Sequence, residues 1–449
     1  MVTAVVGMTK LGMIKHGFRN AAMDRTAQFT QAYRNLTLFP LFKPEEIEEF
    51  RVPYGQRTLA KLRREITAAG EKGKLVFTGH RGCGKSTLLG QLASQMRETG
   101  LFVVGFSIAD MVELSDVNHI NTLYSIALRL MDKAIGQNVP IPESTQTTLI
   151  NWFTQTKSRV YADQLKQEMS IGANIFDFFT GKLQKERAFR EEIKETYQNS
   201  VSDLSRQIDL IAAAIQSATH RQVLVIIDDL DKLDLPVVKT LFQENINSLY
   251  SPSIRVIFTI PISVIREPGL MDMISTKSRV IQLPVTKFFY KEDAHQLDAK
   301  PIEENVEMLQ TILERRIPDD LIEPEIKREI VMLSGGVLRE MVRLGQECCQ
   351  ECMLTMDMQP EKTGVKIDAA ILKEAAKNLR NQFARTLGSN LLNLLVETYK
   401  MFAPPDAKSE EFLELLHSLY VLEYENDELW YDLHPLIVNL LRRRQLIEP

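Results

Sequence analysis

The sequence predicts an α/β fold in which a parallel sheet lies between two layers of helices. Residues 223–227 form a continuous apolar run, which is typical of a strand that is buried on both faces of a parallel sheet. Residues 74–77 and 254–261 also have the pattern of short strands. A segment with helical spacing, 86–100, follows the first of them after a short loop. The composition, 44% hydrophobic and 25% charged, fits a globular protein whose 449 residues form several domains.

The loop after the first strand has the residues of a phosphate-binding turn. In "FTGHRGCGKSTLL", residues 77–89, Gly79 is followed after four residues by Gly84-Lys85-Ser86. The glycines let backbone N–H groups turn inward and let phosphate oxygens approach closely. An ordinary strand-to-helix turn is the alternative. The flanking apolar strand and the helical spacing behind the loop argue against it.

Each residue type in this loop has a chemical role. Lys85 can reach the terminal phosphates as a point charge, and Ser86 can place its hydroxyl on Mg²⁺. The amino end of the following helix adds a positive field. We therefore expect the nucleotide to be bound by Gly79, Gly82, Cys83, Gly84, Lys85, Ser86 and Thr87.

A second apolar strand ends in two acidic residues. In "QVLVIIDDLDKLD", the apolar residues 223–227 precede Asp228 and Asp229. Ligands of open α/β sheets bind at the carboxyl ends of the strands. We expect Asp228 to hold Mg²⁺ together with Ser86, and Asp229 to act as the base that orients the attacking water. The alternative is an acidic turn that caps a core strand.

Three further residues complete the predicted site. Thr259 lies near the end of the strand at 254–261, where its hydroxyl can hydrogen-bond the attacking water or the γ-phosphate. Arg279 opens a short strand, and Arg339 lies on a helix that begins after the break at 334–336. A single arginine is more often a solvated surface residue.

Together these residues resemble the AAA+ ATPases and their relatives, the STAND group of signalling NTPases, over roughly residues 50–380. The order of motifs is similar to that of the origin-recognition branch. The resemblance implies a P-loop that binds Mg-ATP, a first sensor at Thr259, and a lid arginine, Arg339, that contacts the γ-phosphate. It also implies that Arg279 reaches a neighbouring subunit's site and that "VPYG" at 52–55 packs the adenine.

Two features depart from the AAA+ pattern. The second acid is Asp229, where hydrolytically active AAA+ members usually carry Glu, and one methylene less moves the carboxylate by about 1.5 Å. Lys85 and Asp228 are 143 positions apart, which is more than a compact core needs. Aspartate pairs are familiar in the STAND-like branch, so slow hydrolysis and switch behaviour become more plausible.

The long separation between Lys85 and Asp228 predicts a helical insertion at about 112–219. Its apolar spacing predicts one helix from about 183 to 217, which would span about 50 Å. Upstream, Ile175, Phe176, Phe178 and Phe179 form an apolar patch. The patch is either core under that helix, which we favour, or an interaction surface or membrane-touching tip.

The last 65 or so residues predict a helical module with a hairpin turning at Asn426-Asp427. The arrangement resembles a winged helix, a fold often used on DNA. From Arg385 to Pro449, however, 6 basic residues stand against 11 acidic ones. Phosphate backbones repel such a surface. We therefore favour a protein contact, and interpret Arg442, Arg443 and Arg444 as the solvated end of a helix.

The whole-chain features predict a cytoplasmic protein. Four cysteines fit a reducing compartment, and Cys348 and Cys352 are better explained as small buried helix residues than as metal ligands. A net charge of −5 gives no bulk attraction to nucleic acid. No apolar run approaches the roughly 18 residues of a transmembrane helix.

The predicted domains are an N-terminal helical segment (1–50), a P-loop NTPase core (51–285), a helical lid (286–380) and a winged-helix-like domain (381–449). Together they predict a three-layer α/β/α ATPase that acts as a nucleotide-controlled switch on protein partners, with ATP/ADP and Mg²⁺ as ligands and a homo-oligomer as one form of assembly. The alternatives are a DNA-remodelling ATPase of the origin-recognition kind and a non-hydrolysing scaffold held together by ATP.

Overall fold

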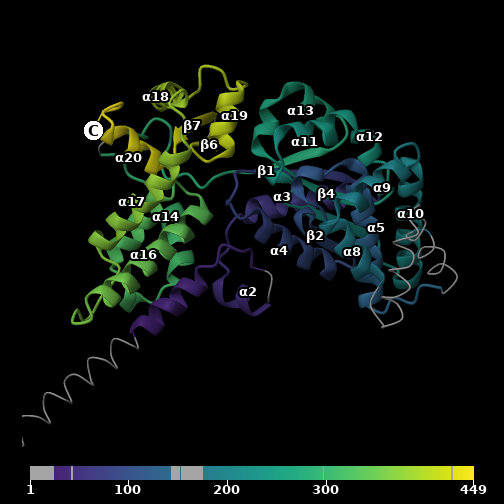
Figure 1. The fold of residues 1–449 in the computed structure, drawn as a ribbon, viewed down its shortest axis with the longest axis horizontal. Helices are drawn as coiled ribbons and strands as arrows, with labels where there is room; N and C mark the ends of the chain where they lie inside the picture. Colours follow the sequence, from purple (N-terminus) through teal and green to yellow (C-terminus); the bar gives the residue numbers. More distant parts are fainter. Residues whose placement is uncertain are drawn as a thin grey trace, which may run out of the picture. The chain divides into compact units, whose positions relative to one another are not determined.

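The structure is a computed structural model that describes residues 25–41, 44–142, 152, 175–296, 298–425 and 428–448. The chain divides into two compact units (Figure 1). Unit 1 contains the described residues up to Tyr54, Gly82–Gly84 and the chain from Pro284 onward. Unit 2 contains Gly55–Arg81 and Lys85–Leu283. Each unit has its own buried apolar side chains.

In the part of the chain that the structure describes, unit 2 is built on a five-stranded parallel sheet. Its strands are β1 (Lys74–Gly79), β2 (Phe102–Ser107), β3 (Val223–Asp228), β4 (Arg255–Ile260) and β5 (Arg279–Leu283). Their order is β2-β3-β4-β1-β5, and every neighbouring pair is parallel. The carboxyl ends of β1 and β3 therefore lie at the same edge of the sheet, on either side of β4.

Helices cover both faces of this sheet (Figure 1). α3 (Gln56–Ala68) and α4 (Lys85–Glu98) pack on one face. α5 (His119–Gly136) and α10 (Val201–Thr219) pack on the other, where Val76, Val225 and Phe258 enter the same hydrophobic cluster. These strand residues alternate with residues that face α3 and α4, as strand geometry requires. The predicted three-layer α/β/α class is confirmed.

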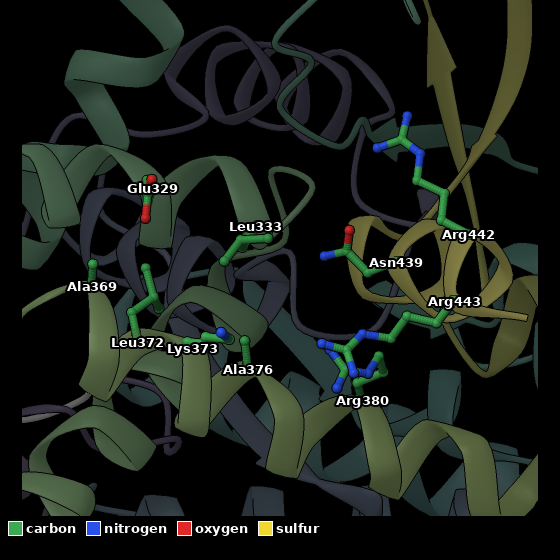
Figure 2. A pocket seen from close by; sticks show the side chains of 10 residues that line it. All are labelled: Glu329, Leu333, Ala369, Leu372, Lys373, Ala376, Arg380, Asn439, Arg442 and Arg443. Carbon is green, nitrogen blue, oxygen red and sulfur yellow. The ribbon is translucent and has the colours of Figure 1, made fainter. Parts of the chain in front are cut away.

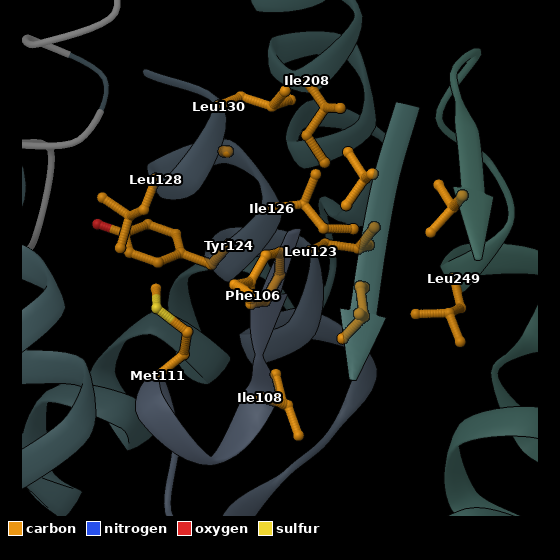
Figure 3. Packing of buried hydrophobic residues seen from close by; sticks show 14 of the residues in the cluster. Phe106, Ile108, Met111, Leu123, Tyr124, Ile126, Leu128, Leu130, Ile208 and Leu249 are labelled. Carbon is orange, nitrogen blue, oxygen red and sulfur yellow. The ribbon is translucent and has the colours of Figure 1, made fainter. Parts of the chain in front are cut away.

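The insertion between β2 and β3 is helical, and its described part packs on the sheet as an extension of the core. Leu123, Tyr124 and Ile126 of α5 are almost fully buried. Figure 3 shows these residues around Phe106 of β2, with Ile208 of α10 in the same cluster. The insertion therefore adds apolar volume to the face that it covers.

The prediction of one long helix from 183 to 217 is wrong. The structure has three helices there, α8 (Ile175–Lys185), α9 (Arg187–Tyr197) and α10. The guanidinium of Arg190 donates to the carbonyls of Leu183 and Gln184 at the end of α8, both at 3.0 Å. It also pairs with Asp116 at 2.7 Å. Tertiary bonds to a buried arginine thus replace the helical bonds that a continuous helix would make.

The apolar patch upstream is core for the residues whose side chains are described. Phe176 and Phe179 are 1% exposed and belong to the cluster on the sheet, and Phe178 packs against it. The side chain of Ile175 lies outside the described residues. Core packing, the favoured interpretation, is confirmed for Phe176 and Phe179.

Unit 1 contains a group of helices that come after the last sheet strand in the sequence. They are α14 (Glu303–Glu314), α15 (Pro324–Leu333), α16 (Leu338–Met358) and α17 (Ala369–Thr386). The break at 334–336 separates α15 from α16, as predicted. Cys348, Cys349 and Cys352 on α16 are free and buried, and burial raises the pKa of each thiol. Protonated thiols are poor metal ligands, which agrees with the interpretation of these cysteines as core residues.

The segment before the core is helical in part. Residues 25–35 form a helix, and α2 (Pro44–Phe50) follows. Thr30 contacts the sulfur of Met353 on α16, and the guanidinium of Arg25 donates to the carbonyl of Val365. This first helix therefore packs within unit 1.

The tail of unit 1 contains the predicted hairpin. Its elements are α18 (Leu391–Met401), α19 (Glu410–His417), β6 (Val421–Glu425), β7 (Leu429–Leu433) and α20 (Pro435–Arg443). β6 and β7 pair antiparallel. The predicted turn at Asn426-Asp427 lies outside the described residues. The winged-helix resemblance and the domain boundaries stay predictions.

The remaining elements are short. They are η1 (Ile108–Asp110), η2 (Leu114–Asp116), η3 (Leu230–Lys232), α11 (Leu235–Lys239), η4 (Thr240–Glu244), α12 (Ile246–Leu249), η5 (Ile262–Arg266), α13 (Pro268–Ser275) and η6 (Asp319–Leu321). Among the described residues, no helix is both long and apolar enough to cross a membrane.

Candidate nucleotide site

The phosphate loop joins β1 to α4, as predicted. Gly82 and Gly84 have φ angles of 81° and 89°, a conformation that residues with a Cβ rarely adopt. A Cβ at Gly82 would also lie 2.5 Å from the Cβ of Arg339. The loop therefore needs glycine at these positions for backbone conformation and for space.

Lys85 opens α4, and its ammonium group is fully bonded. It donates to the carbonyls of Gly79 (2.8 Å) and His80 (2.9 Å) and pairs with the Asp231 carboxylate at 2.8 Å. Both side chains of the ion pair are less than a tenth exposed. An ammonium has three protons to donate. An incoming phosphate must therefore displace at least one of these partners.

Asp231 is a third acid at the site, which the sequence motifs do not predict. Its pKa is lowered because the charge and hydrogen bond of Lys85 outweigh the opposing effect of burial. The signal was present in "IIDDLDKLD", where a third acid follows the predicted pair by two positions. Only the turn of η3 places this carboxylate against Lys85.

Asp228 ends β3 beside the start of α4. Its carboxylate hydrogen-bonds Ser86 and accepts from the backbone N–H of Asp229 at 2.8 Å. Burial, and then the charge of Asp231, raise the pKa of Asp228 to about 6. The structure thus brings together the two residues that the sequence predicts as magnesium ligands.

Asp229 has an unusual backbone and a doubly bound side chain. Its φ of 66° is rare for a non-glycine residue and re-aims the chain after β3. One carboxylate oxygen accepts from the Ser107 hydroxyl at 2.6 Å, and the other pairs with Lys232 at 2.7 Å. The predicted base is therefore engaged by two partners in this structure.

Thr259 is fully buried and ties β4 to the acidic turn. Its hydroxyl accepts from the N–H of Leu230 at 3.0 Å and donates to the carbonyl of Ile227 at 3.3 Å. These bonds hold both ends of the segment that carries Asp228 and Asp229. Thr259 thus positions the acids in this structure. Its predicted contact with water or the γ-phosphate stays a prediction.

The two predicted arginines lie in different units. Arg279 is exposed at the amino end of β5, opposite Leu75 of β1. Along β5, Arg279 lies four residues, at about 3.3 Å per residue, from the sheet edge that carries the phosphate loop. The structure therefore does not bring Arg279 into its own chain's site. In unit 1, the backbone N–H of Arg339 donates to the carbonyl of Gly82 at 3.0 Å.

The donor set at this sheet edge fits a magnesium ion. Carboxylate oxygens of Asp228, Asp229 and Asp231 lie within 4.8 Å of one another, and the Ser86 hydroxyl is bonded to Asp228. Mg²⁺ prefers such oxygen ligands. Burial and then the charge of Asp231 raise the pKa of Asp228, and a divalent cation bound here would favour its charged form.

The chain is similar to proteins of one known family. Residues 59–265, which include the phosphate loop and the acidic turn, match the KAP family P-loop domain. No curated protein matches the chain. Among solved structures, a threonine-to-valine variant of RuvB from Thermotoga maritima is similar, at 13% identity over 92% of this chain and 100% of that chain, with a TM-score of 0.38.

The family match and the sheet agree about the core. A phosphate loop between a parallel strand and its helix, with acids at the end of a second strand, is the arrangement of P-loop NTPases. The chain therefore contains a P-loop NTPase domain, and nucleotide binding is the activity that this domain supports.

Proposed function

We propose that this protein is a Mg-ATP-dependent switch that acts on protein partners, of the AAA+ or STAND-like kind. The observation that carries the proposal is the cluster of Lys85, Ser86, Asp228 and Asp231 at the carboxyl edge of the sheet. These residues combine a phosphate-binding cation with oxygen ligands for a metal.

Each residue has a role in the proposed site. Lys85 leaves Asp231 and grips the terminal phosphates, while Ser86 and Asp228 hold Mg²⁺. A magnesium ion held by these residues would supply charge that neutralises the phosphates. Asp229 orients water, and Thr259 holds the acidic turn in place.

The geometry of Asp229 supports slow hydrolysis. Its carboxylate is shorter than the Glu of active AAA+ members, and Ser107 and Lys232 already engage both of its oxygens. A carboxylate whose two oxygens are both bonded must release a partner before it can accept a hydrogen bond from the attacking water. Long-lived ATP and ADP states would suit a switch better than a processive motor.

Steady-state phosphate release tests this proposal. We expect slow Mg-dependent hydrolysis of ATP that Asp229→Asn reduces at least tenfold and that duplex DNA does not stimulate. Turnover that is negligible and unchanged in Asp229→Asn would favour the non-hydrolysing scaffold. Strong stimulation by DNA, lost at high salt, would favour a DNA-remodelling ATPase.

Oligomerisation is tested by size measurement. If Arg279 reaches a neighbouring subunit's site, Mg-ATP should increase the molecular mass in solution and Arg279→Ala should lower hydrolysis without lowering ATP affinity. Normal assembly and normal hydrolysis in Arg279→Ala would contradict the predicted role in trans.

A further inference from the structure

A cavity of about 330 Å³ lies among α15, α17 and α20, all within unit 1. Residues of α17 line it at helical spacing, so that one face of this helix forms a wall. Figure 2 shows the side chains around the cavity, which come from three helices: Glu329, Leu333, Ala369, Leu372, Lys373, Ala376, Arg380, Asn439, Arg442 and Arg443.

The lining is strongly basic. It contains four cationic side chains and one carboxylate, that of Glu329. Arg442 donates to the carbonyl of Glu448 and to the hydroxyl of Tyr399. Among the residues that the structure describes, neither a hydrogen bond nor an ion pair connects the side chains of Lys373, Arg380 or Arg443 to any partner. The cavity thus has positive charge that the protein does not balance.

Arg380 is the unusual member of this group. Its side chain lines the cavity although the residue is only 7% exposed. Its pKa is lowered by burial and by the like charge of Arg443, yet arginine stays protonated in proteins. In Figure 2 the side chains of Arg380 and Arg443 converge on the same part of the cavity. A buried, unpaired charge beside a like charge is costly unless an anion balances it.

We propose that this cavity binds a small organic phosphate, with the phosphate group held between the guanidinium groups of Arg380 and Arg443. Guanidinium groups match phosphate oxygens through paired N–H donors, and two of them suit a dianion. Lys373 adds a third charge at the rim. The volume is at the lower end of the range for small-molecule sites.

The rest of the cavity explains why the ligand should have an organic part. Leu333, Leu372 and the methyl groups of Ala369 and Ala376 form an apolar wall, and Asn439 adds a polar group from α20. A bare phosphate ion would leave this wall without contacts. Every lining residue lies between 329 and 443, so the site is separate in sequence from the phosphate loop.

The test requires a chain whose phosphate loop does not itself bind the probe. We use the full chain with Lys85→Met and Asp231→Asn, and titrate glycerol 3-phosphate by calorimetry. We expect one site per chain. Arg443→Gln should weaken binding at least about tenfold, because each lost charge-assisted hydrogen bond is worth that much. Arg444→Gln, a neighbouring exposed arginine that does not line the cavity, should leave the affinity within about twofold.

Arg380→Gln gives a second measurement. In phosphate-free buffer we expect its melting temperature to equal or exceed that of the parent chain, since the change removes an unpaired buried charge. We also expect glycerol 3-phosphate to raise the melting temperature of the parent chain and not that of the variant. If Arg380→Gln does not fold, the exposed pair Arg443→Gln and Arg444→Gln still decides the test.

Several results would overturn the proposal. One is an absence of glycerol 3-phosphate binding, and another is equal weakening by Arg443→Gln and Arg444→Gln. Tighter binding of inorganic phosphate than of glycerol 3-phosphate would assign the site to the free ion. Co-sedimentation with phosphatidylcholine vesicles that contain phosphatidic acid, without binding of glycerol 3-phosphate, would assign it to a lipid headgroup.

Discussion

At the scale of single residues, the state of Lys85 is the main finding. Its ammonium is buried and bonded to Asp231 and to two carbonyls of its own loop. In the proposed site, Lys85 must therefore exchange partners to bind phosphate, and its separation from Asp231 offsets part of the attraction for ATP. This exchange would lower the affinity for ATP.

The first prediction concerns this ion pair. Lys85→Met leaves the Asp231 carboxylate buried without its main partner, and should lower the free energy of unfolding by about 3–5 kcal/mol. Adding Asp231→Asn should recover most of the lost free energy of unfolding, because no unpaired charge remains. Chemical denaturation of both variants, with Asp234→Asn as an exposed control, measures the effect. Equal stability of the single and double variants would show that the pair is not coupled.

At the scale of elements, side chains distant in sequence decide where helices begin and end. Arg190 is 3% exposed and joins the end of α8 to Asp116 of η2. The hydrophobic spacing runs on through this region, so it does not mark the break. The arginine satisfies the carbonyls that α8 leaves open, and α9 starts one residue later.

The second prediction follows from that role. Arg190→Met keeps the apolar stem but leaves Asp116 and two carbonyls without their donor. We expect a loss of about 3–5 kcal/mol in stability and faster hydrogen exchange in α8. Arg187→Met, exposed on the same helix, should change stability by less than about 0.5 kcal/mol. Similar effects of the two substitutions would contradict the role of Arg190.

The third prediction concerns the start of α20. His434 is fully buried, its Nδ1 accepts from the N–H of Leu436, and burial lowers its pKa to about 3. In the unfolded chain the histidine side chain takes up a proton near pH 6.5. The contribution of the buried, neutral His434 to stability is therefore complete above that pH and falls as the pH decreases. Between pH 7 and pH 5 the loss should be about 2 kcal/mol.

His434→Asn is the matched variant for this prediction. Asparagine can accept from the same helix N–H but does not titrate in this range. Hydrogen exchange of α20 at pH 7 and pH 5, corrected for the intrinsic rate, should show a smaller loss of protection in the variant. The same pH dependence in both proteins would exclude His434 as its source.

At the scale of the whole molecule, the chain divides into two units, and the tip of the phosphate loop, Gly82–Gly84, belongs to the same unit as α16. The proposed switch requires that nucleotide bound at the loop changes the behaviour of α16. The bond from the backbone N–H of Arg339 to the carbonyl of Gly82 places this residue beside the loop, and we expect the Arg339 side chain to carry the coupling.

The fourth prediction separates binding from switching. Arg339→Ala should bind Mg-ATP within about threefold of the wild-type affinity, because Lys85 and the metal ligands are unchanged. The difference in hydrogen exchange of α16 between the ATP and ADP states should be lost. Arg343→Ala, one turn further along α16, is the control and should keep that difference. A normal response in Arg339→Ala would exclude this arginine as the sensor.

The sequence by itself determined the sheet, the phosphate loop and the acids at the end of β3, because these features depend on local composition and on the common edge of parallel strands. Only the tertiary structure decided that Asp231 pairs with Lys85, that Thr259 ties down the acidic turn, that α8 and α9 are separate, and that Arg443 meets Arg380. Each of these depends on residues that the fold brings together from separate parts of the sequence. The energy of such an interaction depends on how deeply the groups are buried and on which other partners compete for them. The pattern of residues along the sequence gives no information about either.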